Sequence, residues 1–413
     1  MPPALFALAL GAFSIGTTEF VASGVLPEVS TAFTVSVSTA GYLSTCYALG
    51  VLVGAPVLAL LGTRLAQQRM LLGLLGLFVL GNLVCACAPG FGVLLAGRVV
   101  AAMAHSAFFG IGSIVAARLV APQRQTAALS VVFAGLATAN IAGVPLSTLT
   151  AQQLGWRWTF AAVAALGLLS MAGVSRLVPT DSPARTPVPV RSEVAALGDT
   201  QVLLAMALAL LSIGAMFATI TYVAPMLTDV TGYGPAAVIW LLVLLGAGMT
   251  LGNLVGGRLG DRALMPVLCW ALVTLTAASA LFSLTAHSRV SAAVTLVVIG
   301  GAAFATVPTT QKRVLDLAVE APTLASAMVI GAANLGCALA TWLGGLVLDA
   351  GLSPTSPSWV GAGLAGSALL LALVSAELDR RRPEPQGMLR TQHAPPAAWS
   401  PGVSRRGATS QAG

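Results

Sequence analysis

Ser-Ile-Gly-Thr-Thr-Glu-Phe, residues 14–20, lies in the middle of the first long apolar segment of the chain. This stretch places the carboxylate of Glu19 where a bilayer would present hydrocarbon. An acid at that depth costs roughly 2.5–3.5 kcal/mol, so such residues are usually protonated, paired or facing a wet cavity. The sequence places no other acid inside an apolar segment, and we interpret Glu19 as functional. The alternative is a polar residue that the fold merely tolerates.

The composition of the chain excludes an ordinary soluble protein. Hydrophobic residues make up 57% of it and charged residues 8%, and the mean hydropathy is +0.91. Apolar stretches of about 20 residues recur, which suits helices that span a hydrocarbon core roughly 30 Å thick. The alternating short strands of a membrane β-barrel are not seen in the sequence. No basic n-region precedes the first segment, so we do not expect a removable signal peptide.

The apolar segments predict an all-α integral membrane protein with twelve transmembrane helices in two six-helix bundles. The first bundle covers residues 1–177, a polar cytoplasmic linker 178–200, the second bundle 201–376 and a disordered cytoplasmic tail 377–413. The predicted spans are 4–26, 40–61, 69–88, 92–117, 127–149, 158–177, 201–226, 236–257, 264–285, 290–310, 323–348 and 357–376.

The two bundles are related by internal duplication. The matched positions, each separated by 198 residues, are Ser14-Ile15-Gly16 with Ser212-Ile213-Gly214, Gly50 with Gly248, and Gly54 with Gly252. Gly248, Gly252 and Gly256 form a ladder of small residues, which we interpret as a surface for close helix packing. Glu19 corresponds to Phe217, so the duplication does not account for the acid.

Basic residues predict the orientation, because they collect on the cytoplasmic side of short loops. Placing both termini in the cytoplasm leaves only Arg157 and Arg289 facing outward, with Arg98 inside the fourth span. The cytoplasmic set is Arg64, Arg69, Arg118, Arg124, Arg176, Arg185, Arg191, Arg258, Arg262, Lys312, Arg313 and the six arginines of the tail. This topology explains the net charge of +7 and gives no support to nucleic-acid binding. We expect the chain in the inner (plasma) membrane.

The loop after the eighth predicted span reads Gly257-Arg258-Leu259-Gly260-Asp261-Arg262. It resembles the loop signature of the major facilitator superfamily, a glycine followed four residues later by aspartate and then by arginine. The first-half copy is degraded, with Thr63 in place of the aspartate and Arg64 retained. An Asp at a helix end can pair with a cation or a neighbouring helix N-terminus and hold one face shut. We predict gating roles for Asp261, Arg262 and Arg64; a solvated turn is the alternative.

Further stretches resemble the twelve-span drug:proton antiporter branch of that superfamily, including chloramphenicol exporters of actinobacterial type. The likeness runs to about residue 376 and is carried by Gly16 to Phe20 with Leu26-Pro27, Arg98, Asn140 to Ser147, and Gly155-Trp156-Arg157. In that branch a Gly-Pro motif of the fifth span marks exporters, and Gly143-Val144-Pro145 resembles it with one residue inserted. The resemblance implies gating by Gly143 and Pro145, whereas without it Pro145 is a kink that neighbouring helices accommodate. The residues expected to line the cavity are Phe20, Asn140, Phe217 and Asn334.

Arg98 is the natural partner of Glu19. The first span runs outward and the fourth inward, so at about 1.5 Å per residue the two side chains lie at nearly the same depth. Burial favours the neutral acid and a nearby cation favours the carboxylate, so a residue balanced between them can load and release a proton. The alternative is that Arg98 extends to the outer interface. His105 shares the helical face of Arg98 and either relays protons or packs through a hydrogen bond.

Other residues indicate no separate chemistry. Lys312 and Arg313 are interpreted as topology charges that end the tenth span, and Trp156 and Trp158 as part of an interface belt. The five cysteines suggest free thiols. The sequence has no metal-ligand spacing, phosphate loop or nucleophile elbow, so we expect no metal, no cofactor and no enzymatic activity. Energy would then come from an ion gradient.

The sequence predicts two bundles around a cavity near the bilayer midplane that opens alternately to each side. Our leading hypothesis is proton-coupled export of a small lipophilic compound or drug, such as a chloramphenicol-like molecule. Export of a sugar, nucleoside or amino-acid derivative is the alternative within the same class. A non-transporting membrane sensor is the alternative from a different class. The expected partners are a small-molecule substrate, protons and the bilayer, with no nucleic acid, and the chain is expected to be a monomer.

Overall fold

The computed structural model describes the chain except for residues 36, 63–64, 181–189, 224–225, 320–321 and 382–413. Arg64 and most of the predicted tail therefore lie outside the described residues. The contacts divide the chain into two compact units, Met1–Ser375 and Ala376–Gly413. The predicted site residues belong to the first unit, and the arrangement given below is that of this unit.

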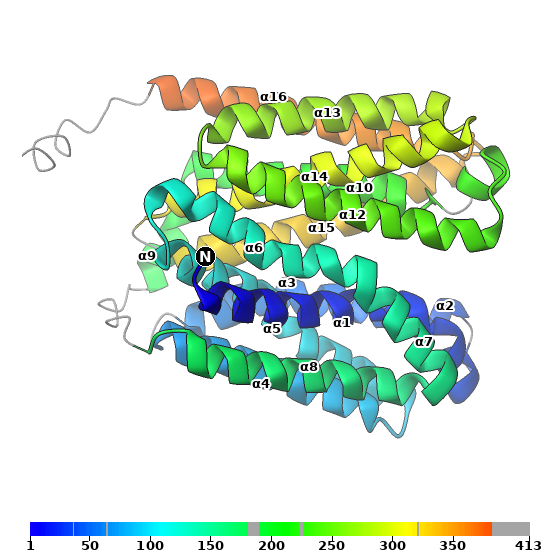
Figure 1. Cartoon of the computed structure of the whole chain (residues 1–413), viewed down its shortest axis with the longest axis horizontal. Helices are drawn as coiled ribbons and strands as arrows, with labels where there is room; N and C mark the ends of the chain where they lie inside the picture. The colour runs from blue at the N-terminus through cyan, green and yellow to red at the C-terminus, as the bar shows by residue number, and fades with distance from the viewer. Residues whose placement is uncertain (36, 63–64, 181–189, 224–225, 320–321, 382–413) are drawn as a thin grey trace, which may run out of the picture. The chain divides into compact units, whose positions relative to one another are not determined.

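The described chain is a succession of helices (Figure 1). A backbone in hydrocarbon must satisfy its N–H and C=O groups internally, and a helix does so within one segment. The longer helices are α1 Pro3–Phe33, α3 Tyr42–Gly62, α4 Gln67–Ala86, α5 Phe91–Arg118, α6 Gln125–Thr138, α8 Trp156–Leu177, α10 Thr200–Ile220, α12 Pro235–Gly260, α13 Leu264–Thr285, α14 Arg289–Leu317, α15 Pro322–Asp349 and α16 Ser356–Arg381. The shorter ones are α2 Val37–Ala40, η1 Pro122–Arg124, η2 Ala139–Gly143, α7 Val144–Leu154, α9 Val190–Ala196 and η3 Met226–Val230.

Among the described residues, 10 helices are long and apolar enough to cross a membrane, and two apolar stretches, Pro3–Glu19 and Tyr42–Leu58, are shorter. These elements follow the predicted spans in order along the chain. No strand occurs in the part of the chain that the structure describes. The predicted all-α membrane fold is therefore confirmed.

Several spans end later than the sequence indicated. α1 continues to Phe33, so Glu28 lies in the same helix as Glu19, beyond the predicted end of the span at residue 26. The proline at position 27 does not end α1, because packed neighbours and adjusted backbone can satisfy the carbonyl that a proline frees. α14 extends to Leu317 and α16 to Arg381, so the predicted tail begins inside a helix.

Two other segments are built differently from the prediction. The fifth span consists of α6, the π-helical η2 and α7, with Pro145 in the first turn of α7. Proline lacks the N–H that would continue the regular ladder, and a π turn re-pairs the neighbouring carbonyls. The linker was predicted as polar chain, but its C-terminal part forms α9.

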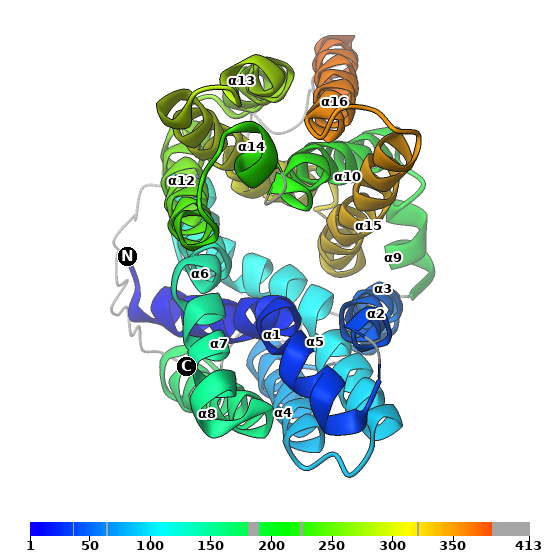
Figure 2. The same ribbon diagram turned by 90° about the vertical axis from the view of Figure 1, so that its right-hand side faces the viewer.

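The long helices alternate in direction. We call the end at which α1 begins the N-side and the opposite end the far side; α9 lies at the N-side, whereas α2 and α7 lie toward the far side (Figure 1). Seen along the helices, α1 to α8 form one group and α10 to α16 the other (Figure 2). The two groups, called the first and second half below, meet where α6 contacts α12 and α14, and where α15 contacts α3 and α5.

The duplicated glycines make equivalent contacts in the two halves. A Cβ added at Gly54 would clash with the carbonyl oxygen of Met103, and one added at Gly252 with that of Gly301. Met103 and Gly301 are themselves 198 residues apart. The same close approach of α3 to α5 is therefore repeated between α12 and α14, which supports the inferred duplication.

Candidate functional site

Two cavities lie where the halves meet, one of about 400 Å³ and one of about 70 Å³. Both are lined by Glu19, Phe217, Asn334 and Cys337. The larger cavity lies toward the far side and adds the hydroxyl-bearing side chains Ser44, Thr45, Tyr47, Thr221 and Thr341. The smaller lies toward the N-side and adds His105 among mainly apolar side chains, including Phe109, Val307 and Ile330. The cavity wall thus changes from polar to apolar toward the N-side.

Glu19 projects from the middle of α1 into the wall shared by both cavities. The polar side chains just before it are used locally, since Ser14 bonds the carbonyl of Leu10 and Thr17 that of Phe13, each at 2.8 Å. Within the described residues, the Glu19 carboxylate has no hydrogen-bond partner. It is therefore open to a proton or to a bound molecule.

Arg98 of α5 is fully buried behind Glu19. Its Nη1 donates to the carbonyl of Thr18 at 2.6 Å and its Nε to that of Leu43 at 3.2 Å. The first of these bonds puts Arg98 at the depth of Glu19, as the helix directions predict. The alternative in which Arg98 extends to the outer interface was wrong, because these carbonyls hold it inside the bundle. Both bonds go to backbone oxygens and not to the Glu19 carboxylate.

Tyr47 of α3 connects Arg98 with His105. Its ring lies under the guanidinium of Arg98, and the distance between the ring centroid and Cζ of Arg98 is 4.4 Å, which allows a cation–π contact. Its hydroxyl lies 3.1 Å from Nδ1 of His105 and 3.4 Å from the carbonyl oxygen of Ile15. His105 also packs against Phe109, with ring centroids 5.1 Å apart. His105 is therefore hydrogen-bonded and also lines the smaller cavity.

Sequence reasoning missed Tyr47 and Asn82 as members of this group. Asn82 of α4 is fully buried, and its Oδ1 accepts a hydrogen bond of 3.1 Å from the Thr18 hydroxyl. Its Nδ2 donates to the carbonyl of Phe78. An amide in the middle of an apolar span was a signal that the sequence offered, since such groups need a partner in hydrocarbon. Tyr47 gave no comparable signal, because a lone tyrosine also suits an interface.

The predicted cavity residues have different positions. Phe217 of α10 and Asn334 of α15 line both cavities opposite Glu19. Asn140 lies in η2, where Gly246 of α12 packs close to its Cβ, and its buried Nδ2 has no partner among the described residues. The side chain of Phe20 lies outside the part of the chain that the structure describes.

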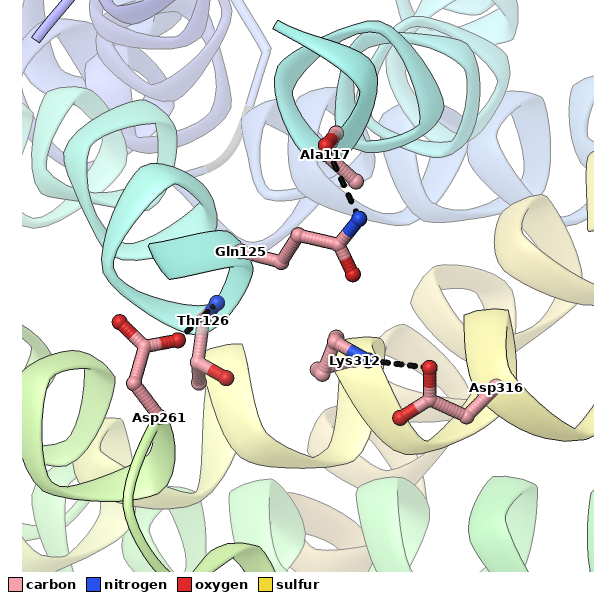
Figure 3. Close-up of polar contacts among 6 residues, drawn as sticks. All are labelled: Ala117, Gln125, Thr126, Asp261, Lys312 and Asp316. Carbon is pink, nitrogen blue, oxygen red and sulfur yellow. Dashed lines mark hydrogen bonds and ion pairs between the residues drawn. The ribbon is translucent and has the colours of Figure 1, made fainter. Parts of the chain in front are cut away.

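Asp261 joins the two halves at the N-side (Figure 3). Its Oδ1 accepts from the backbone N–H of Thr126 at 2.7 Å and its Oδ2 from that of Ala127 at 3.1 Å. These amides belong to the first turn of α6, where the helix dipole favours a negative charge. The contact has the geometry that a latch between the halves requires.

A further hydrogen bond joins α12 to α6. Asn253 of α12 donates to the carbonyl of Ser130 in α6 at 2.6 Å. Figure 3 also shows Lys312 paired with Asp316 on α14, and Gln125 donating to the carbonyl of Ala117. The side chain of Arg262 is exposed and, within the described residues, forms no hydrogen bond or ion pair. The N-side of the first unit is therefore closed by α6 against α12 and α14.

Gly143 ends η2 against α1. A Cβ at Gly143 would clash with Oγ1 of Thr17, two residues before Glu19. The π segment therefore packs directly on the helix that carries the central acid. Pro145 follows in the first turn of α7 and is half-buried.

Two interpretations of peripheral residues were wrong. Arg313 does not end a span as a solvated charge, because it is buried within α14, where its Nη2 donates to Oε1 of Gln201 at 2.9 Å and to Oγ of Ser375 at 2.6 Å. Trp156 is buried beneath the Arg157 guanidinium, whereas Trp158 is exposed as an interface residue would be. Spacing alone does not reveal which neighbours cover a residue near a helix end.

All five cysteines are free, and the described residues contain no group of three or more His, Cys, Asp or Glu side chains that would hold a metal ion.

The Major Facilitator Superfamily model matches residues 8–323. The chain belongs to this superfamily. The predicted resemblance is confirmed.

Named transport and resistance proteins are similar to this chain over most of their length. The inner membrane transport protein YdhP of Escherichia coli K12 is 42% identical over 380 residues, covering 92% of this chain and 97% of YdhP. A chloramphenicol resistance protein of Streptomyces lividans is 38% identical over 375 residues, covering 90% of this chain and 96% of that protein. The crystal structure of the superfamily transporter FucP in the outward conformation matches with a TM-score of 0.72 at 14% identity, covering 90% of this chain and 98% of FucP. The similarity to FucP concerns the fold alone. Membership of the superfamily identifies the chain as a membrane transporter.

Proposed function

We propose that this transporter is a proton-coupled exporter of small lipophilic compounds, including chloramphenicol-like drugs, that works by alternating access. The observation that carries the proposal is the position of Glu19, whose carboxylate faces both cavities and has no hydrogen-bond partner among the described residues. Ionisable groups inside a membrane bundle and beside a cavity commonly mark ion pathways or proton relays, which is the role that we assign to Glu19.

The surroundings of Glu19 support a coupling role. Arg98 is fixed by two carbonyls and stabilises the carboxylate by its charge, whereas the apolar wall below favours the neutral acid. Protonation from the far side would remove the negative charge from the cavity, and proton release toward the N-side would restore it. Substrate and proton can then compete for one site, either directly or through conformation.

The cavity and the relatives support the proposed substrate class. A cavity of about 400 Å³ suits a small molecule, with Phe217 offering an aromatic contact and Asn334 an amide for orientation. The related Streptomyces protein is named for chloramphenicol resistance. Chloramphenicol is accordingly the first probe to use, followed by a panel of antibiotics tested on cells with and without the gene.

The decisive experiment uses purified protein in vesicles with a pH-sensitive dye inside. Adding drug should move protons through the wild type, and an imposed proton gradient should concentrate the drug. Glu19→Gln mimics the protonated acid, so we expect it to abolish gradient-driven transport while a neutral drug still binds. Phe217→Leu changes the same cavity at the equivalent position of the other half and should keep coupling. If Glu19→Gln vesicles still concentrate the drug, Glu19 is not the coupling site; if no tested compound moves protons through the wild type, the sensor hypothesis is favoured.

We further propose that the N-side is cytoplasmic and that the protein lies in the plasma membrane. The support is the run of basic residues at N-side helix ends, including Arg118, Arg124, Arg258 and Arg262. Reporter fusions at residue 190 and in the tail should report the cytoplasm, and fusions at residues 30 and 230 the outside. An outside signal at residue 190 would reverse the orientation.

Export of a sugar is the second candidate, and the hydroxyl-bearing far-side wall favours it. Ser44, Thr45, Thr221 and Thr341 offer donors and acceptors that suit a polyhydroxylated molecule. Competition between labelled sugars and chloramphenicol in the same vesicles would separate the two candidates, because a sugar exporter should release accumulated sugar without drug-induced proton movement.

A further inference from the structure

Three buried polar side chains continue the cavity wall toward the N-side. On α5, His105 and Phe109 line the smaller cavity and Ser113 follows four residues later. On α14, Phe304 and Val307 line it and Gln311 follows four residues later. Spacings of three and four residues keep a helical face, so both side chains lie one turn beyond the cavity on its own face.

The third side chain comes from α15, which runs in the opposite direction. Ile330, Ala333 and Cys337 line the smaller cavity, and Ser326 precedes Ile330 by four residues. It therefore lies one turn toward the N-side on the same face. We call Ser113, Gln311 and Ser326 the N-side polar layer. Ser113 and Gln311 occupy equivalent positions of the duplicated halves, 198 residues apart.

The N-side polar layer is enclosed by the contact between the halves. All three side chains have a relative exposure of 0%. Val307 and Leu315, one turn on either side of Gln311, pack against a hydrophobic core built mainly from the first half. A Cβ added at Gly110 of α5 would lie 2.8 Å from the backbone nitrogen of Ala327. Helices of both halves thus approach closely around this layer.

These side chains have no hydrogen-bond partners within the described residues. Neither amide atom of Gln311 is bonded, and the same holds for the hydroxyl oxygens of Ser113 and Ser326. A buried polar group without a partner costs about 1–3 kcal/mol, which an apolar residue of similar shape would avoid. The layer therefore weakens the closed contact in which it lies, unlike Asp261, which strengthens it.

We propose that the N-side polar layer is a hydration site that opens the N-side of the transporter. Separation of α5 from α15, and of α6 from α14, lets water bond the Gln311 amide and the two serine hydroxyls. The free energy of their hydration then favours the open arrangement and offsets part of the loss of the Asp261 contact. The inference deepens the alternating-access part of the proposed function and requires neither a known substrate nor proton coupling.

The test measures the distance between spin labels at Gln123 and Ala263, exposed N-side positions of the two halves, in lipid nanodiscs without substrate. The background has its five native cysteines replaced and carries Asp261→Asn, which should raise the open population. Gln311→Met keeps the length of the side chain and removes the amide, so it should raise the ratio of closed to open about tenfold. Ser326→Ala should raise it by a smaller factor, about threefold.

A matched control and an opposite variant complete the design. Ser279 of α13 is equally buried and also has no hydrogen-bond partner in the described part of the chain. It lies on a helix that packs within the second half and not at the contact between the halves, so Ser279→Ala should leave the ratio of closed to open unchanged. Gln311→Glu, made without Asp261→Asn, should open the N-side because a charge needs water more than an amide does. If Gln311→Met and Ser326→Ala behave like Ser279→Ala, or if Gln311→Glu stays closed, the proposal is overturned. Because no drug or proton gradient is present, this result is separate from that of the export experiment.

Discussion

The two halves share a backbone plan but differ in the chemistry that they carry. The positions of Glu19, Tyr47, Arg98 and His105 correspond, 198 residues further on, to Phe217, Leu245, Leu296 and Ala303. The buried polar group of the first half is thus replaced by apolar core in the second. Glycine contacts such as those of Gly54 and Gly252 are kept in both. Duplication preserved the backbone contacts, whereas the side chains of the cavity diverged.

The N-side shows the opposite asymmetry. Asp261 of the second half bonds the first turn of α6, whereas the corresponding position of the first half holds Thr63, which lies outside the described residues. One half therefore carries the candidate coupling group and the other the candidate latch. The two candidate functions thus lie in different halves, each at a position where the duplicated halves carry different residues.

The largest effect on transport should come from replacing Arg98 of the first half by the leucine found at the equivalent position of the second half. Arg98→Leu introduces the residue of position 296 and leaves Glu19 without its countercharge and two carbonyls without a donor. Removing one of two buried opposite charges costs about 3–5 kcal/mol, so we expect transport to fall roughly 100-fold or more. The rate of drug uptake into vesicles measures this fall in transport. Leu296→Met is the control, and we expect it to lower the transport rate by less than about tenfold.

The next effect tests whether the halves share their packing. Gly54→Ala and Gly252→Ala each force a Cβ against a carbonyl oxygen, of Met103 and Gly301 respectively. We expect each to destabilise the fold by about 1–3 kcal/mol, seen as a lower Tm of the purified protein. Gly73→Ala has open space around the new methyl group and should leave the Tm unchanged or raise it. A lower Tm for only one of the variants Gly54→Ala and Gly252→Ala would show that the packing of the two halves is not equivalent.

A smaller effect is expected at the latch. Asp261→Asn keeps the shape but weakens both bonds to the amides of Thr126 and Ala127, so it should slow transport roughly tenfold by changing the exchange between states. Drug affinity, measured by calorimetry, should stay within about twofold of the wild type, because the cavity is untouched. Asp316→Asn removes the same charge from an exposed pair with Lys312 and should have little effect. Loss of drug binding in a folded Asp261→Asn protein would argue against a latch.

The smallest effect sharpens the role of Tyr47. Tyr47→Phe removes the bonds to His105 and Ile15 but keeps the ring under Arg98, so we expect transport to fall about threefold. Tyr47→Leu, which copies Leu245 of the second half, also removes the cation–π contact and should lower transport further. Tyr222→Phe removes a hydroxyl bonded to the carbonyl of Thr341 within the second half, and it should leave proton-coupled transport close to wild type. Equal losses for Tyr47→Phe and Tyr222→Phe would mean that the Tyr47 hydroxyl has no special role.

Much of the fold was predictable because hydrocarbon imposes one strong rule on the backbone. The order of the spans follows from runs of apolar residues alone, since each run must form a helix to satisfy its own N–H and C=O groups. Helix ends were less predictable. α1 passes position 27 to reach Phe33, and α14 continues past Arg313 to Leu317, because neighbouring helices cover residues that would otherwise meet water. The local sequence pattern does not show which residues are covered by neighbouring helices.

The candidate site divides in the same way. The sequence singled out Glu19 and Arg98, because a charge in an apolar run is visible without any structure. It also indicated their common depth from the helix directions and the constant rise per residue. It did not indicate that Arg98 bonds the carbonyls of Thr18 and Leu43, nor that Tyr47 lies between Arg98 and His105.

The membrane class, the succession of helices, the duplication and the charged residues that are costly to bury could all be predicted from the order of residues along the chain. The packing of distant helices was needed to show which helices of the two halves meet, that Asp261 bonds the first turn of α6, and that Ser113, Gln311 and Ser326 are buried. The physical reason is the range of the interactions. Hydropathy and helix formation depend on neighbours along the chain, whereas hydrogen bonds and cavities depend on side chains brought together from distant spans.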